Sequence, residues 1–208
     1  MIITPCVDDK VFPFLMIDNF YNEEELELIW EELTSMDKVG RMFIKTPDHE
    51  GVAKNEDGTP RAELKRFELD SLYEGKREES NIFKVYGKVL SNEVIEAYEN
   101  VTPAWRTLIT TNNDCTIVNY YDHGDYYLEH NDVFMHSCLT FFYTQPKKFT
   151  GGDLVFTQSG TTVECLHNRM ILFPSHYLHR VTEIEMKEED RNKGLGRYSF
   201  AHFYTYNN

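Results

Sequence analysis

The sequence lacks a basic stripe, a long apolar run and closely spaced cysteines. Lys and Arg number 21 against 35 Asp and Glu, and the formal charge of -14 repels phosphate backbones, so we expect no nucleic-acid partner. No run of about 18 uncharged apolar residues occurs and no basic, apolar leader begins the chain, which predicts no membrane association. The same two absences predict a cytoplasmic protein. Because Cys6, Cys115, Cys138 and Cys165 form no close pair, we expect reduced thiols and no zinc or redox motif.

The length of 208 residues, 41% of them hydrophobic, suits one domain with a full core. We expect residues 1–208 to form this single domain. Residues 1–105 would supply an amino-terminal strand, helices and a polar excursion, and residues 106–208 would supply the core.

Two helices are predicted in the first part. "YNEEELELIWEEL" begins with Asn22 and has Glu25 three residues on, which is a capping-box pattern. "NIFKVYGKVLSNEVIEAYEN" predicts a second helix over about 81–100, from its spacing of apolar residues. Between the helices, about 46–80 is polar and rich in turn formers, and the sequence leaves open whether it forms a flap.

Beyond residue 105 the sequence changes to short β-rich runs separated by turn residues. The runs are "CTIVNYY", "DYYLEHND", "SCLTFFYT", "DLVFT", "TTVECL", "MILFP", "LHRVTEI" and "RYSFAHFYTY". About eight strands at this spacing predict a sandwich or a jelly-roll barrel, with the earlier helices packed outside it.

The run "YYLEHNDVF" places His130 and Asp132 one residue apart. In a strand, residues i and i+2 point to the same face, so the imidazole and the carboxylate would lie side by side, as two ligands of one metal do. The pattern alone is weak, because His123-Gly124-Asp125 repeats it. That second instance lies in a predicted hairpin turn, and we discount it as a metal pair.

A third ligand must come from a distant segment, since one strand supplies only two neighbouring inward groups. "FPSHYLHRV" offers His176, in a predicted turn, and His179, which begins a strand-like run; we favour His179. Two histidines and one carboxylate form the facial set that leaves three positions open on non-haem Fe(II). Any one of these residues taken alone is more often a hydrogen-bonded structural residue.

The last strand, "GRYSFAHFY", places Arg197 and Ser199 on one face. A guanidinium inside a barrel is costly unless it meets an anion, and its planar fork suits a carboxylate. The alternative is an ion pair with one of the many acids of this chain.

Read together, "NYYDHGDYYLEHND", "GGDLVF", "ILFPSHYLHRV" and "GRYSF", over about residues 115–206, resemble the Fe(II)/2-oxoglutarate-dependent dioxygenases of the prolyl 4-hydroxylase-like branch. The resemblance implies a mainly β fold with flanking helices, whose core is a double-stranded β-helix, a cupin-like jelly-roll of about eight strands. It implies that His130, Asp132 and His179 are the catalytic iron ligands. It also implies that 2-oxoglutarate and O2 are consumed, with ascorbate as a candidate reductant, and that Arg197 meets the far carboxylate of 2-oxoglutarate.

Two tyrosines are further cosubstrate candidates by the same resemblance. Tyr120 lies ten residues before His130, as a cosubstrate-contacting Tyr does in some relatives, and Tyr143 is a weaker candidate for the far carboxylate. For both, an aromatic residue of the β core is at least as good an interpretation. Gly151 and Gly152 would allow a tight approach between strands.

This sequence departs from the family pattern in the position of the basic residue that would bind the far carboxylate of 2-oxoglutarate. Arg197 lies 18 residues after His179, about twice the usual interval of relatives, and "EMKEEDRNKGLG" resembles an inserted loop. Lys187 and Arg191 lie nearer that interval but in a charge-rich, turn-like run, so we keep Arg197 as the anchor.

The resulting expectation is an enzyme that hydroxylates an aliphatic C–H, most of all that of a prolyl residue in a peptide or protein, and releases succinate and CO2. Free amino acids stay open as substrates. The alternatives are oxidative demethylation of nucleic-acid bases by the same centre, and a jelly-roll binding module without a catalytic metal. Asp132 stands where halogenating relatives have a small residue, which favours hydroxylation.

Overall fold

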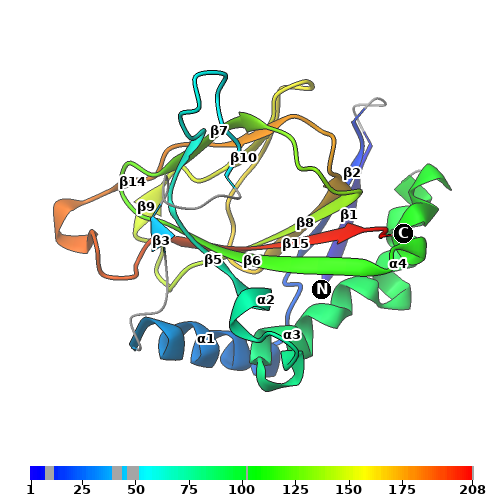
Figure 1. Cartoon of the computed structure of the whole chain (residues 1–208), viewed down its shortest axis with the longest axis horizontal. Coiled ribbons are helices and arrows are strands. Elements are labelled where there is room, and N and C mark those ends of the chain that lie inside the picture. The colour runs from blue at the N-terminus through cyan, green and yellow to red at the C-terminus, as the bar shows by residue number, and fades with distance from the viewer. Residues whose placement is uncertain (8–11, 39–43, 46–51, 102, 208) are drawn as a thin grey trace.

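The computed structural model describes residues 1–7, 12–38, 44–45, 52–101 and 103–207. These residues form two facing sheets, and helices lie along the outer side of the larger sheet (Figure 1). Every strand pairing in both sheets is antiparallel among the described residues. The predicted fold class, a mainly β jelly-roll with flanking helices, is confirmed.

The large sheet forms one wall of the core. From edge to edge its strands are β1 (Ile2–Cys6), β2 (Phe14–Asp18), β12 (Arg169–Pro174), β8 (His136–Phe142), β15 (Arg197–Thr205), β6 (Asn113–Tyr121), β5 (Lys65–Glu68) and β3 (Ile44–Lys45). β15 pairs along its length with β6 and β8. Because directly opposed residues point to the same face, these three strands share one inner surface.

The small sheet forms the opposite wall. Its strands are, in order, β11 (Thr161–Val163), β10 (Leu154–Phe156), β13 (His179–Val181), β7 (Tyr126–His130) and β4 (Ala62–Glu63), and a separate pair joins β14 (Glu185–Met186) to β9 (Phe149–Thr150). The register of β13 and β7 sets His179 directly opposite His130. All eight runs predicted as strands contain one.

The helices cover the outer face of the large sheet. They are α1 (Glu23–Lys38), α2 (Leu69–Leu72), α3 (Asn81–Tyr86) and α4 (Asn92–Val101), with 3-10 turns η1 (Arg77–Glu79), η2 (Gly87–Leu90) and η3 (Pro103–Thr110). A further 3-10 turn, η4 (Glu188–Asp190), lies in the loop between β14 and β15. The Trp30 ring of α1 packs edge-on against Tyr198 of β15, with centroids 5.5 Å apart. None of the helices in the described ranges is both long and apolar enough to cross a membrane.

The two helix predictions had different outcomes. At the start of α1, Asn22 Oδ1 accepts the Glu25 N–H at 2.9 Å, and Glu25 Oε2 accepts the Asn22 N–H at 2.7 Å, which confirms the capping box. The single helix over 81–100 is wrong, because α3 ends at Tyr86 and α4 begins at Asn92. Gly87 disfavours helix and Ser91 adopts an extended backbone that precedes α4, so the chain turns between them.

The polar excursion is less peripheral than its composition predicts. Residues 46–51 lie outside the described residues, but β5 joins the large sheet beside β6, with Arg66 opposite Asn119. The four-residue run "KRFE" has too little apolar alternation to predict a strand, and it is held by pairing with β6. This pairing brings Arg66 to the inner surface.

Two glycines allow the chain to pass close to neighbouring segments. A Cβ on Gly151 would lie 1.9 Å from the Glu183 carbonyl oxygen, and one on Gly152 would lie 2.9 Å from Arg197 Cδ. Both glycines have positive φ angles, of 75° and 74°. A side chain at either position would push against its neighbour as well as strain the backbone, which agrees with the expected structural role.

Candidate metal centre

Three side chains converge between the sheets, from the end of β7, the loop directly after it and the start of β13. The ligand atoms of His130, Asp132 and His179 all lie within 4.8 Å of one another, and within the described ranges they form the sole group of three or more possible metal ligands. His130 Nε2 lies 3.8 Å from Asp132 Oδ1, and His179 Nε2 lies 3.7 Å from Asp132 Oδ2. These separations suit three ligands of one ion with bonds of about 2 Å.

Asp132 is positioned by contacts beyond the strand. β7 ends at His130, so strand alternation does not align the two side chains as we expected. Instead, the Asp132 N–H donates to the Ser175 carbonyl at 3.0 Å, and the Ser137 hydroxyl donates to Asp132 Oδ2 at 2.6 Å. These bonds fix both the backbone and the carboxylate.

Backbone carbonyls determine which nitrogen of each histidine faces inward. His130 Nδ1 lies 2.8 Å from the Leu128 carbonyl oxygen, and His179 Nδ1 lies 2.9 Å from that of Tyr177. A carbonyl only accepts, so both Nδ1 atoms carry the proton and both Nε2 atoms offer a lone pair to the centre. Burial, and next the neighbouring His179, lower the pKa of His130 to about 3, so it is neutral at physiological pH.

Replacing Ser137 with Ala is expected to weaken Fe(II) binding about 10- to 100-fold. The change removes the hydroxyl that orients Asp132 but leaves all three candidate ligands in place. Anaerobic Fe(II) titration measures the effect. Ser159→Ala is the control, because the hydroxyl of Ser159 bonds only within its own turn, to Phe156 and Thr161. Equal Fe(II) affinity of the Ser137→Ala variant and the wild type would contradict this role.

A narrow cavity extends from the three side chains to Arg197. The Arg197 side chain is 1% exposed, its Nε and Nη1 have no hydrogen-bond partner, and it makes no ion pair with any described acid. Its guanidinium packs against the rings of Tyr121 and Phe141, at 4.7 and 4.6 Å from their centroids. An intramolecular ion pair therefore does not explain the burial of the Arg197 guanidinium. Because buried N–H groups are nearly always hydrogen-bonded, we expect a bound ligand to supply the acceptor.

Two further polar side chains line this cavity. Ser199 shares the inner face with Arg197, as the alternation of the last strand predicts, and Asn119 lies opposite Ser199 on β6 with a partnerless Oδ1. The Arg197 guanidinium and the Ser199 hydroxyl are donors that suit a carboxylate-bearing ligand. The cavity volume is about 30 Å³, so surrounding side chains must shift when a five-carbon diacid enters.

The tyrosine candidates lie elsewhere. Tyr120 points to the helix-covered face, where its ring packs on Tyr198 and its hydroxyl donates to Asp122 at 2.7 Å. Tyr121, one residue along and opposite Arg197, lines the cavity instead, since adjacent strand residues point to opposite faces. Tyr143 packs against Phe149 and His167 and is not among the cavity-lining residues.

The remaining basic and histidine candidates also lie outside the cavity. His176 is exposed, and His123, Lys187 and Arg191 line a surface groove beside β14. The sequence missed Asn119, Tyr121, Arg66 and Ser137. A polar residue within the apolar run "CTIVNYY" was a signal for Asn119, but Arg66 had none, because it reaches the site through strand pairing alone.

The comparisons with known proteins agree with this geometry. Residues 115–205, which run from β6 to the end of β15 and include all three candidate ligands, match the 2OG-Fe(II) oxygenase superfamily. The jelly-roll core is that of a 2OG-Fe(II) oxygenase. This superfamily uses Fe(II), 2-oxoglutarate and O2, so the chain is a 2-oxoglutarate-dependent non-haem iron dioxygenase.

Solved structures share the fold of this oxygenase at low sequence identity. A Pseudomonas putida prolyl-4-hydroxylase is 15% identical with a TM-score of 0.62, and the match covers 97% of each chain. A Trichoplax adhaerens prolyl hydroxylase, solved with a hypoxia inducible factor peptide, is 13% identical over 92% of this chain and 83% of that one, with a TM-score of 0.61. NgTET1, solved with 5mC DNA, is 17% identical over 96% and 74%, with a TM-score of 0.58. No curated protein sequence matches the oxygenase.

Proposed function

We propose that this oxygenase hydroxylates an aliphatic C–H of a prolyl residue in a peptide or protein and converts 2-oxoglutarate to succinate and CO2. His130, Asp132 and His179 would hold Fe(II), and Arg197, with Ser199 beside it, would hold the far carboxylate of 2-oxoglutarate. The observation that carries the proposal is the meeting of two Nε2 lone pairs and a carboxylate with a partnerless guanidinium in one cavity. The likeness to prolyl hydroxylases supports the substrate class.

Fe(II), when bound by these residues, would supply the oxidising chemistry together with O2, and the chain supplies position and exclusion of water. The Leu128 and Tyr177 carbonyls keep both Nε2 atoms directed at the centre. The Tyr127 ring stacks on His130 at 3.6 Å between centroids and shields it from solvent. Arg197 would orient 2-oxoglutarate so that its keto acid end reaches the three ligands.

Incubation with Fe(II), 2-oxoglutarate, ascorbate and a panel of proline-containing peptides tests the proposal. Free amino acids, proline included, run in parallel. We expect succinate release that depends on a peptide, with that peptide gaining the mass of one oxygen atom at proline. Coupled turnover of free amino acids alone would overturn the peptide part, and succinate release without oxygen transfer to any proline would overturn the prolyl part.

Oxidation of nucleic-acid bases is the second candidate, because NgTET1 shares the fold. The net charge of -14 disfavours a nucleic-acid substrate, and salt-sensitive binding of DNA or RNA would support one. A binding module without catalysis would show no turnover in any assay. The cytoplasmic location stays a prediction, supported by four free cysteines.

A further inference from the structure

A second, larger pocket opens beside the candidate metal centre. This pocket, here named the outer pocket, has a volume of about 480 Å³, within the range of small-molecule sites. His130 and Asp132 line both the outer pocket and the narrow cavity, whereas Arg197 lines only the narrow cavity. A group bound in the outer pocket therefore lies next to two of the three candidate iron ligands, where a substrate must lie to be oxidised.

The inner surface of the large sheet changes from polar to apolar along β15. The inward residues of this strand are, in order, Arg197, Ser199, Ala201 and Phe203. Their partners on β6 are, in the same order, Tyr121, Asn119, Ile117 and Cys115. The first two pairs line the narrow cavity proposed for 2-oxoglutarate, while Cys115, Ile117 and Phe203 line the outer pocket. The outer pocket therefore lies over the apolar end of this surface.

Apolar side chains also form the rim of the outer pocket that is next to the metal centre. The Phe134 ring stacks on Phe203, with centroids 4.5 Å apart and planes 16° from parallel. Val133, directly after Asp132, is 89% exposed. An exposed apolar side chain beside a stacked aromatic pair gains free energy when an apolar group of a ligand covers it.

A second wall comes from the side of the small sheet. Val52 and Ala53 both line the outer pocket, and Val52 is buried. The Ala53 N–H donates to the Tyr127 hydroxyl at 3.2 Å, and the Tyr127 ring stacks on His130. This wall is therefore tied to a candidate iron ligand, and the outer pocket has apolar residues on more than one side.

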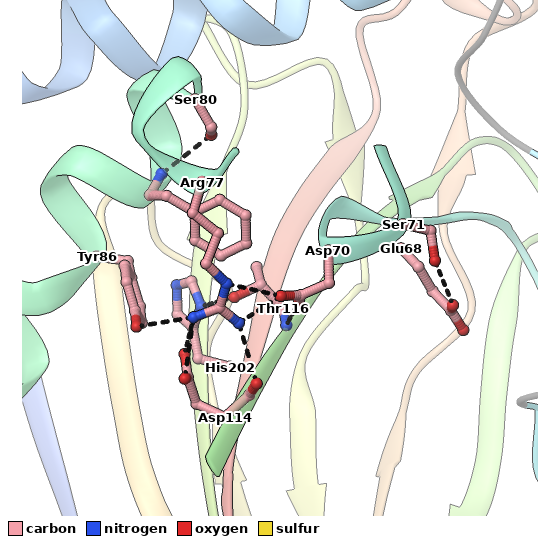
Figure 2. Close-up of polar contacts among 10 residues, drawn as sticks. Glu68, Asp70, Ser71, Arg77, Ser80, Tyr86, Asp114, Thr116 and His202 are labelled. Atoms are coloured by element: carbon pink, nitrogen blue, oxygen red, sulfur yellow. Dashed lines mark hydrogen bonds and ion pairs between the residues drawn. The ribbon is translucent and has the colours of Figure 1, made fainter. Parts of the chain in front are cut away.

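Two carboxylates that also line the outer pocket are engaged by other groups of the chain (Figure 2). Arg77 binds Asp70 Oδ1 through two nitrogens, and the Thr116 N–H donates to Asp70 Oδ2 at 2.7 Å. The Ser71 hydroxyl donates to Glu68 Oε2 at 3.1 Å. Because these carboxylates already have partners, the exposed apolar side chains at the rim offer the larger gain to a ligand.

We propose that the outer pocket is the substrate pocket and that Val133 and Phe134 select peptides with a large apolar side chain, such as leucine, within about two residues of the oxidised residue. This inference rests on the proposed function. The residue to be oxidised lies beside Asp132, and the apolar side chain of the same peptide covers Val133 and Phe134. The spacing agrees, because two residues separate Phe134 from Asp132 and span at most about 7 Å.

The test uses three peptides that share a central proline and differ only in carrying Leu, Asn or Ala at the flanking positions. Asn has nearly the size of Leu without its apolar surface, so this pair separates polarity from size. Binding is measured by calorimetry on protein loaded with Fe(II) and 2-oxoglutarate without O2. We expect the wild type to bind the Leu peptide about tenfold or more tightly than the other two, with a more negative heat-capacity change.

Two variants remove the apolar rim in different ways. Phe134→Ala should reduce the preference for Leu to about twofold or less, and Phe134→Leu should keep most of it. Val133→Asp should reduce the preference as well, because a carboxylate resists burial, and the exposed position leaves the core undisturbed. Each variant should keep the visible charge-transfer band of the anaerobic complex with Fe(II) and 2-oxoglutarate. If Phe134→Ala changes this band, Val133→Asp decides.

Ile109→Asp is the matched control, because it places a carboxylate at another exposed apolar position. Ile109 is 56% exposed in η3 and is not among the residues that line the outer pocket. This variant should keep the wild-type preference for the Leu peptide. A preference that Val133→Asp and Phe134→Ala leave unchanged, or that Ile109→Asp also removes, would overturn the role of the two rim residues.

The outcomes separate this inference from the proposed function, with turnover measured by succinate release and by oxygen transfer to proline. Equal binding and hydroxylation of all three peptides would overturn the inference and leave the proposed function intact. Binding selective for Leu that Val133→Asp removes, without hydroxylation, would overturn prolyl hydroxylation and leave the apolar selection intact. No binding and no turnover of any peptide would overturn both.

Discussion

Replacing His179 with Ala is expected to abolish the visible charge-transfer band that wild-type protein forms anaerobically with Fe(II) and 2-oxoglutarate. The change removes one of two imidazoles that converge with Asp132, and the ion would keep only two protein ligands. A metal supplies several kcal/mol of transition-state stabilisation, so 2-oxoglutarate turnover should fall about 10³-fold or more. His130→Ala and Asp132→Ala should act alike, as measured by absorption spectra and succinate release.

His123→Ala is the matched control for the ligand variants. It belongs to the other His-x-Asp sequence of the chain, but its ring lies at the surface groove, where Nδ1 accepts the Met186 N–H. Asn131→Ala, between the candidate ligands in sequence, is a second control. Both should keep the band. A band that survives in Asp132→Ala, or that disappears in His123→Ala, would show that the ligand set is wrong.

Replacing Arg197 with Met is expected to weaken 2-oxoglutarate binding at least about 30-fold and leave Fe(II) affinity unchanged. The guanidinium would make a charge-assisted bond in a buried site, and losing such a bond costs about 2–5 kcal/mol. Without ligand, the unfolding temperature should not fall, because the change removes buried N–H groups that have no partner.

Thermal unfolding with and without 2-oxoglutarate separates a binding role from a structural one. At about 100 times its dissociation constant, 2-oxoglutarate should raise the midpoint of the metal-loaded wild type by about 5–10 °C and that of Arg197→Met far less. Lys187→Ala and Arg191→Ala are the controls, since both side chains lie outside the cavity despite their closer spacing to His179. If either control lost more affinity for 2-oxoglutarate than Arg197→Met, the residue that binds the far carboxylate would lie in the loop between β14 and β15 and not at Arg197.

Local sequence patterns predicted the strands of the core and the beginning of α1. Each strand run has its own alternation or apolar content, and the Asn22–Glu25 capping box forms within four consecutive residues. The prediction of a single helix over 81–100 failed because it too relied on a local pattern. Its apolar spacing continues through Gly87, whereas the chain turns there, and apolar spacing does not report such a turn.

The cosubstrate tyrosine shows where spacing stops being sufficient. Counting back from His130 selects Tyr120, but the register of β6 against β15 turns Tyr121 toward Arg197 and Tyr120 toward the helices. A shift of one residue changes the face, and two adjacent tyrosines give no sign of which one is inward.

The sequence by itself determined the fold class and named His130, Asp132, His179, Arg197 and Ser199, because the order of the motifs and the alternation within the last strand can both be read along the chain. Only the tertiary structure decided that the first three converge, that Arg197 has no acid beside it, and that Arg66, Asn119 and Tyr121 line the same cavity. These facts depend on the pairing of β5, β6 and β15 and on the facing of two sheets. Such contacts join residues far apart in the chain, and no local pattern records them.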